Sequence, residues 1–197
     1  PATLQTKGGI TVQDFPGPQS MIMFGQGGLK FSDPDYFAAS LLNEILGGGR
    51  FSARLMTEVR EKRGLTYGIG TSLAAYDHAE VLVGQFQASN EKVAEASKVI
   101  RDEWAKIAKD GVTAEELANA KTYMTGAYPL RFDGNDTIAS ILVGMQDLGL
   151  PPDYPKTRNA RVDAVTLEDV KRVAARLIKP DDLHFIIVGQ PTGVANE

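Results

Sequence analysis

A short stretch of the chain gathers positive charge in a protein that is acidic as a whole. Residues 50–63 contain five basic and two acidic side chains, and Arg60 lies among them. The sequence GLTY at residues 64–67 then leads from a helical pattern into a strand-like one, with Tyr67 at the strand start. A guanidinium and a phenol that point into one space offer hydrogen-bond donors to carbonyl oxygens or to a developing oxyanion. The alternative interpretation is a solvated, charged helix face.

The remaining reactive side chains form no recognisable catalytic or metal-binding motif. The chain has no cysteine and only two histidines, His78 and His184. A catalytic zinc ion normally takes three protein ligands, so we expect no zinc site within this chain. We interpret His78 as a solvated turn residue and His184 as a strand residue with a local hydrogen bond. Neither histidine has a G-x-S-x-G nucleophile to serve, so serine hydrolysis is not indicated.

Three glycines at residues 47–49 precede Arg50 and Ser52, which gives the segment some likeness to a phosphate-binding loop. The pattern G-x-x-x-x-G-K-[ST] is missing, and these glycines follow a helical segment, whereas a phosphate loop follows a strand. We therefore predict that they end a helix, because glycine adopts left-handed dihedral angles without strain.

The order of strand-like and helical patterns predicts an α+β fold. Strand-like patterns cover residues 10–15, 21–25, 67–73, 80–88 and 183–188. Helical patterns cover residues 34–46, 51–64, a long stretch after Asn90, another that begins with a capping box at 113–116, and residues 137–148 and 166–178. This order favours a mainly antiparallel β-sheet with several α-helices packed on one face. The apolar run MIMFG at residues 21–25 is expected to be a buried strand.

Composition limits the classes of protein that remain. The chain has 197 residues, 43% hydrophobic and 23% charged, which is typical of a globular protein. Its net charge of -4 argues against a nucleic-acid binder, and its apolar runs are far shorter than the roughly 20 residues that cross a bilayer. Without cysteines, the sequence leaves the compartment open between periplasm and cytoplasm.

Glycines and prolines near the start indicate where the domain begins. We interpret residues 1–19 as a linker or an entering strand, and residues 20–197 as a single domain. The chain starts with Pro1 and shows neither a basic start nor an apolar signal core, so we expect it to be a piece of something longer.

One long segment closely resembles a known family. The run LLNEILGGGRFSARLMTEVREKRGLTYGIGTSL at residues 41–73 is similar to the C-terminal domain of the insulinase- or pitrilysin-type zinc metallopeptidases, which include mitochondrial processing peptidase and the core subunits of the respiratory bc complex. The sequences FPGPQSMIMFGQGGL and VTLEDVKRVAARLIKPDDLHFIIVG resemble the first strand and the closing helix and strand of that domain. The resemblance therefore covers nearly the whole chain.

The resemblance implies a divided active site. In that family two similar α+β domains face each other across a closed chamber, and one carries an H-x-x-E-H motif for zinc and water activation. This chain lacks the motif and is similar to the other, inactive domain, which contributes an Arg and a Tyr seven positions apart. By resemblance, Arg60 holds a substrate carbonyl and Tyr67 donates to the scissile carbonyl as it becomes tetrahedral. Zinc is expected in the partner domain or subunit.

Several functional hypotheses follow. The first is a non-zinc, substrate-binding half of a chambered endopeptidase that is inactive alone and acts on peptides with an H-x-x-E-H-bearing partner. That partner is another part of the same chain or a separate subunit. The second is a non-catalytic scaffold of the same fold, as in the respiratory core subunits. A small-molecule-binding α+β domain is a more distant alternative.

Overall fold

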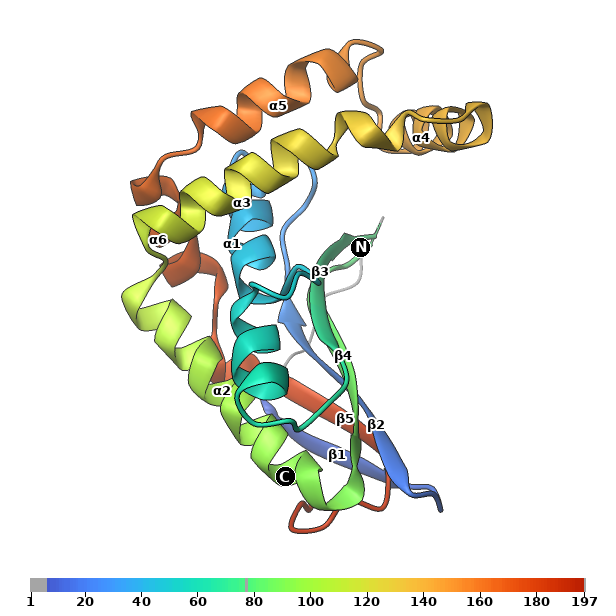
Figure 1. Cartoon of the computed structure of the whole chain (residues 1–197), viewed down its shortest axis with the longest axis vertical. Coiled ribbons are helices and arrows are strands. Elements are labelled where there is room, and N and C mark those ends of the chain that lie inside the picture. The colour runs from blue at the N-terminus through green and yellow to red at the C-terminus, as the bar shows by residue number, and fades with distance from the viewer. Residues whose placement is uncertain (1–6, 77, 197) are drawn as a thin grey trace.

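Alternating apolar residues build one five-stranded sheet, which the computed structural model describes within residues 7–76 and 78–196 (Figure 1). The strands are β1 (Gly9–Asp14), β2 (Gln19–Gly27), β3 (Ile69–Ala75), β4 (Glu80–Ser89) and β5 (His184–Gly189). They lie in the order β1-β5-β2-β4-β3. β1 runs parallel to β5, and the other pairs, β2–β5, β2–β4 and β3–β4, are antiparallel. The predicted α+β fold with a mainly antiparallel sheet is confirmed.

Three long helices cover one face of this sheet: α1 (Tyr36–Gly47), α2 (Val93–Asp110) and α6 (Leu167–Leu177). The helices α3 (Ala114–Ala127), α4 (Asn135–Asp147) and α5 (Tyr154–Ala164) extend beyond this layer as an arm, and α4 overhangs the concave side of the molecule (Figure 1). Short helical segments complete the chain: η1 (Met56–Glu61), η2 (Asn90–Lys92), η3 (Pro129–Arg131) and η4 (Pro180–Asp182).

The hydrophobic core lies between the sheet and the three covering helices. The Phe24 ring centre lies 5.5 Å from that of Phe185, 5.8 Å from that of Trp104 and 6.1 Å from that of Phe86. Gly84 stands directly opposite Phe24 in the β2–β4 register, and a Cβ atom there would come within 2.2 Å of the ring. Because Gly84 has no side chain, it leaves the space that the Phe24 ring fills in the core.

One buried amide ties the sheet to two helices. Gln26 on β2 is 2% exposed, and its Oε1 accepts hydrogen bonds from Trp104 Nε1 at 2.6 Å and from the Lys179 N–H at 3.1 Å. Its Nε2 donates to the Leu177 carbonyl oxygen at 2.6 Å. Because every polar atom of this side chain is paired, the amide is tolerated in the core and fixes β2 against α2 and the end of α6.

The opposite side of the sheet carries no covering helix among the described elements, and we call it the open face. Its central side chains are Met21 and Met23 of β2, Gln85 and Gln87 of β4, and Ile186 and Val188 of β5. Met21 is 40% exposed and Met23 is 47% exposed, whereas Ile22 and Phe24 are buried. The expectation of a buried strand at 21–25 is thus correct for alternate residues only, because one side of β2 has nothing packed on it.

Local signals in the sequence set the helix ends. The capping box at Thr113 and Glu116 is formed in both directions, and α1 ends at Gly47, where the glycines were expected to end a helix. The sequence patterns missed α5, whose segment YPKTRNARVDA is mostly polar and buries only Tyr154 and Val162. A polar helix of this kind leaves no apolar stripe to recognise.

The first described residues bear on the expected domain limits. Part of the stretch expected to be a linker or an entering strand forms β1, whose Thr11 and Val12 pair with Ile186 and Ile187 of β5. Residues 1–6 of that stretch lie outside the described residues.

Within the described ranges, no helix has both the length and the apolar character needed to cross a membrane.

Candidate functional site

The candidate site begins at η1, the segment that carries Arg60. In η1 the hydrogen bonds span five residues, as in Lys62 N–H to the Thr57 carbonyl oxygen at 3.0 Å, which defines a π-helix. Gly64 has a φ of +60°, and its N–H donates to the Arg60 carbonyl oxygen at 2.8 Å. The left-handed glycine ends the helix and turns the chain toward β3, as the sequence GLTY suggested.

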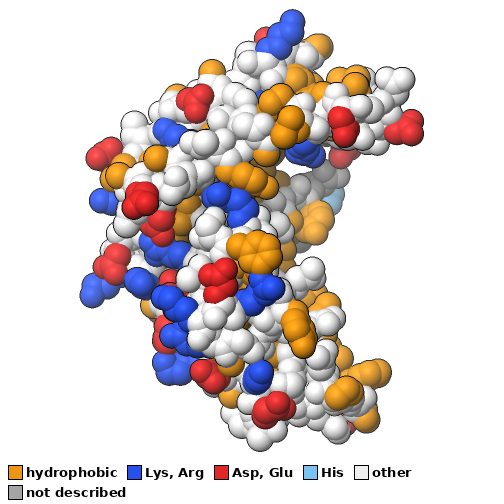
Figure 2. Space-filling model, in the orientation of Figure 1, with side chains coloured by type: hydrophobic (Ala, Val, Ile, Leu, Met, Phe, Trp, Pro, Cys, Tyr) orange, Lys and Arg blue, Asp and Glu red, His pale blue; other side chains and the backbone are white. Residues whose placement is uncertain are grey.

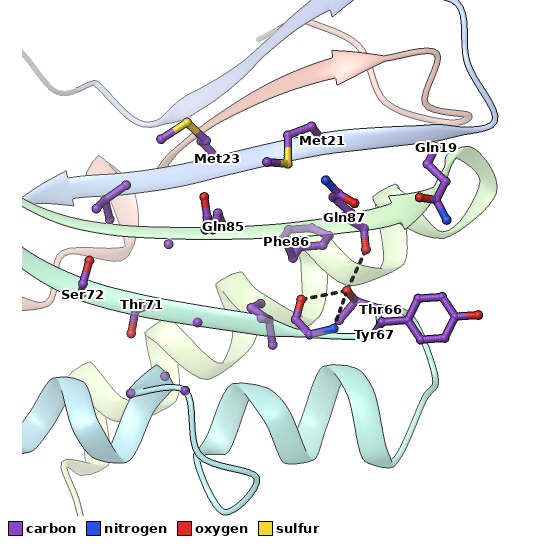
Figure 3. Close-up of a pocket in the computed structure, with 18 residues that line it drawn as sticks. Gln19, Met21, Met23, Thr66, Tyr67, Thr71, Ser72, Gln85, Phe86 and Gln87 are labelled. Atoms are coloured by element: carbon purple, nitrogen blue, oxygen red, sulfur yellow. Dashed lines mark hydrogen bonds between the residues drawn. The ribbon is translucent and has the colours of Figure 1, made fainter. Parts of the chain in front are cut away.

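Tyr67 lies on a backbone that its neighbours hold in place. The Thr66 hydroxyl donates to the Gln87 carbonyl oxygen at 2.7 Å and accepts a hydrogen bond from the Gly68 N–H at 3.2 Å (Figure 3). Thr66 is buried, but Tyr67 itself is 90% exposed and points away from the start of β3 (Figure 3). Within the described residues, its hydroxyl has no hydrogen-bond partner. Tyr67 precedes β3 by two residues, so it belongs to the turn rather than to the strand.

Arg60 differs from the other cations of its segment. Its guanidinium carbon lies 4.6 Å above the centre of the Phe51 ring, and Phe51 is 61% exposed. Phe51, Leu55 and Val59 are spaced four residues apart, as on one side of a helix, but only Leu55 and Val59 are buried. Phe51 lies instead in the turn before the helix, where it serves as a surface for Arg60.

The neighbouring cations are paired with carboxylates. Their shortest N–O distances are 2.5 Å for Arg50 to Glu44, 2.7 Å for Arg54 to Glu116, 2.6 Å for Lys62 to Glu58 and 2.8 Å for Arg63 to Glu58. Hydrogen bonds from Lys62 and Arg63 hold the pKa of Glu58 below its usual value. Within the described residues, Arg60 is the one cation of residues 50–63 that has no carboxylate partner. No carboxylate among the described residues therefore neutralises its charge.

The structure places Tyr67, but not Arg60, at the lining of a pocket that surrounds the edge strand β3 and includes part of the open face. This pocket has a volume of about 610 Å³ and is lined by Tyr67 and its neighbours, by the glycines at 47–49, and by strand residues of β2, β3 and β4. Met21, Met23 and Gln85 lie on the same side of the sheet (Figure 3). No hydrogen bond or ring contact among the described residues joins Arg60 to Tyr67. Arg60 and Tyr67 are thus close in the sequence, but their side chains do not contact each other.

Several residues of this pocket were not singled out from the sequence. Thr66 was missed, although a hydroxyl residue next to an exposed Tyr and close to Gly64 and Gly68 is a recognisable turn signal. Met21 and Met23 were taken for core residues, because an apolar run does not reveal which face is open. Gln85 and Gln87 alternate with buried residues in β4, and that alternation was the available signal.

The histidines lie outside this pocket. His184 is the first residue of β5, as expected of a strand residue. Its hydrogen bonds are not local in the sequence, because Nε2 lies 2.9 Å from the Thr11 hydroxyl and Nδ1 lies 3.1 Å from the Lys7 carbonyl oxygen, 173 and 177 positions away. His78 is exposed in the connection between β3 and β4. Among the residues described, no three His, Cys, Asp or Glu side chains come together as metal ligands. These described side chains therefore do not form a zinc site.

A family model identifies this architecture. Residues 1–124 match the model described as the peptidase M16 inactive domain. Because this match covers more than half of the chain, the protein belongs to the peptidase M16 inactive-domain family, as the resemblance to insulinase- and pitrilysin-type enzymes indicated.

Individual relatives agree with this assignment. The chain is 29% identical over 157 residues to an uncharacterized zinc protease of Streptomyces coelicolor, covering 79% of this chain and 34% of the relative. It is 28% identical over 179 residues to a Helicobacter pylori protein named as a non-peptidase homolog, covering 86% and 39%. The chain thus spans about a third of the length of these curated relatives, so much of each relative has no counterpart here.

Solved structures share the fold. The crystal structure of a peptidase M16 inactive domain from Pseudomonas fluorescens is 34% identical, with a TM-score of 0.84, and covers 100% of this chain and 47% of that chain. A chain of complex III2 from Candida albicans, at 16% identity and a TM-score of 0.79, covers 96% of this chain and 47% of that chain. The second likeness concerns the fold alone.

Proposed function

We propose that this chain is the substrate-binding half of a chambered zinc endopeptidase, and that zinc and the general base come from another domain or subunit with an H-x-x-E-H motif. The observation that carries the proposal is that Arg60 and Tyr67 are both hydrogen-bond donors without a partner among the described side chains. Arg60 has no carboxylate partner within the described residues, and Tyr67 presents a free hydroxyl on a fixed backbone. Both match the residues that the family resemblance assigns to substrate.

The two donors suit different steps. Arg60 offers a fork of N–H donors to a carbonyl oxygen of the peptide backbone, and it holds the substrate in both ground and transition states. Its contact with the exposed Phe51 ring contributes only about 0.5–1 kcal/mol at such a site, so it does not prevent the guanidinium from turning to a substrate. Tyr67 donates to the scissile carbonyl oxygen as negative charge develops there, which stabilises the transition state more than the substrate.

The test uses the chain mixed with its H-x-x-E-H-bearing half, zinc and a peptide substrate. We expect hydrolysis in the mixture and none by this chain alone. Tyr67→Phe is expected to lower kcat by about 100-fold, the usual loss for one transition-state donor. Arg60→Ala is expected to act mainly on KM, because its contact is present in the ground state as well.

Matched controls separate these effects from general surface changes. Tyr76→Phe removes a hydroxyl from another exposed tyrosine, 65% exposed, at the far end of β3, and Arg131→Ala removes an exposed cation from the arm. Both variants should retain full turnover. If Tyr67→Phe and Arg60→Ala also retain it, the assignment of these two residues is wrong.

A scaffold function is the second candidate, and the name of the H. pylori relative, a non-peptidase homolog, favours it. In that case the chain forms a stable complex with its partner, but the mixture hydrolyses no peptide with or without Tyr67. Activity of the mixture that depends on Tyr67 would exclude the scaffold.

A further inference from the structure

The open face of the sheet lacks charge. In the five described strands, no residue that points to this side is Asp, Glu, Lys or Arg, although such residues make up 23% of the chain. In the space-filling view, charged side chains gather over the helical layer, and the sheet side at the lower right is mostly apolar or uncharged (Figure 2). A sheet face that only meets water normally carries charged and polar residues. The composition of this surface is therefore typical of one that contacts another molecule.

Its apolar side chains form one continuous block. Met21 stands opposite Val188, and Met23 stands opposite Ile186, in the β2–β5 register. Ile186 is 49% exposed and Val188 is 37% exposed, so all four side chains remain accessible. On the other side of β2, the same methionines pair with Gln87 and Gln85 of β4. An apolar block bordered by a row of amides results.

This block runs into the pocket that Tyr67 lines. Met21 and Met23 belong to both, and none of the residues that line the pocket is Asp, Glu, Lys, Arg or His. A second pocket, between the start of α1 and the arm, contrasts with it, because Asp33, Arg161 and Arg172 all line that one. Of these two pockets, the one that Tyr67 lines is thus the uncharged one.

We propose that the pocket beside Tyr67, together with the apolar block, binds uncharged, apolar side chains of an extended peptide, while Gln85 and Gln87 pair with polar groups of its backbone. The proposal rests on the function proposed above and adds the class of side chain that the substrate presents there. A charged side chain would lose water at this surface without gaining a partner, so it is rejected.

The shape and the residue types favour a peptide over a folded partner. The open face lies on the concave side of the molecule, beneath the overhang of α4 (Figure 1). Methionine is flexible and polarisable, so it adapts to apolar side chains of different shape. Glutamine offers both a donor and an acceptor to a peptide group.

The test measures direct binding of labelled, unstructured Ser/Ala peptides to the whole 197-residue chain, without zinc or a partner. Three peptides carry leucine, aspartate or lysine at the same positions. We expect the leucine peptide to bind at least about tenfold more tightly than either charged peptide. Met23→Lys should abolish this preference and favour the aspartate peptide.

Further variants keep the result interpretable. Gln85→Lys places the same charge on the neighbour of Met23 and should shift the preference in the same direction. Met23→Leu should keep the leucine preference, and so should Val143→Lys, which changes an apolar side chain of α4 that is 64% exposed. Circular dichroism of each variant shows whether it is folded.

Equal affinity for the three peptides, or no binding of the leucine peptide, would overturn the proposal. So would a dimer of the chain that Met23→Lys dissociates, because the face would then be an interface between copies. Since this assay involves no hydrolysis, its outcome is independent of the turnover test of Tyr67. A leucine preference together with unchanged turnover in Tyr67→Phe would remove the proposed role of Tyr67 and leave the binding surface in place.

Discussion

The two faces of the sheet are built from the same strands, yet they differ in what covers them. On β2, Ile22 and Phe24 lie against helices, and Met21 and Met23 lie on the open face. Both sets are apolar, so the sequence of the strand is that of a sheet covered on both sides. The difference shows that the described helices cover one side of β2 and leave the other side exposed.

The helical side differs from the open face in its electrostatics as well. Asp35, at the start of α1, is 8% exposed, and it pairs with Arg172 and Arg176 of α6. The hydrogen bond from Arg172 is the main cause that lowers the pKa of Asp35, and the bond from Arg176 adds to it against the opposing effect of burial. Ion pairs thus connect α1 to α6. In the described strands, the open face carries no Asp, Glu, Lys or Arg side chain that could form such a pair.

The largest expected effect tests the covered face. Phe24→Ala removes a ring that contacts Phe86, Trp104 and Phe185, so we expect a loss of about 3–5 kcal/mol in the free energy of unfolding. Urea unfolding followed by circular dichroism measures it. A loss below about 1 kcal/mol would mean that this face is not the close-packed one.

An intermediate effect tests the helical layer and its dependence on pH. Arg54, which lies just before η1, and Glu116 of α3 form two parallel hydrogen bonds, at 2.7 and 2.8 Å. Burial alone would raise the pKa of Glu116, but hydrogen bonds from Arg54 and Thr113 outweigh it and hold the pKa below its usual value. Glu116→Gln is therefore expected to lower stability by about 2 kcal/mol at neutral pH.

The sign of the pH dependence follows from the lowered pKa. The ionised carboxylate stabilises the fold above its unfolded pKa of about 4.3, and this contribution is lost as pH falls through the folded pKa. The stability difference between Glu116→Gln and the parent should thus shrink below about pH 4.3. Glu115→Gln, on an exposed neighbour, is the matched control and should change little. A difference that stays constant at acidic pH would contradict the role of the ionised pair.

The smallest effect completes the comparison. Met23→Ala changes the residue next to Phe24 but on the open face, where Met23 is 47% exposed, so we expect a loss of at most about 1 kcal/mol for the chain alone. The same urea experiment measures it. A loss as large as that of Phe24→Ala would show that the open face is packed against another copy of the chain in solution.

Local patterns in the sequence predicted much of the fold. The capping box at Thr113 and the glycines after α1 depend on hydrogen bonds within a few residues, so they could be read directly. The strands β3 and β4 followed from alternating apolar residues. Helix α5 was missed, since its polar sequence carries no periodic apolar signal.

The candidate site was only partly accessible in this way. Arg60 and Tyr67 stood out through a local excess of charge, the turn at Gly64 and the family resemblance. That Arg60 alone in its segment lacks a carboxylate partner, within the described residues, depends on Glu44 and Glu116 from other helices. The hydrogen bond from the Thr66 hydroxyl to the Gln87 carbonyl oxygen of β4 likewise joins residues that are 21 positions apart.

The sequence by itself determined the class of fold, the family, the helix ends and the absence of charge among the residues of the open face. Each of these is written in neighbouring residues or in a periodic pattern, so no knowledge of distant contacts is needed. Only the tertiary structure decided which side of β2 is covered, which cations are paired, and that Met21 and Met23 line one pocket with Tyr67. These features arise where strands and helices far apart in the chain pack together, because packing, rather than local propensity, selects the buried face.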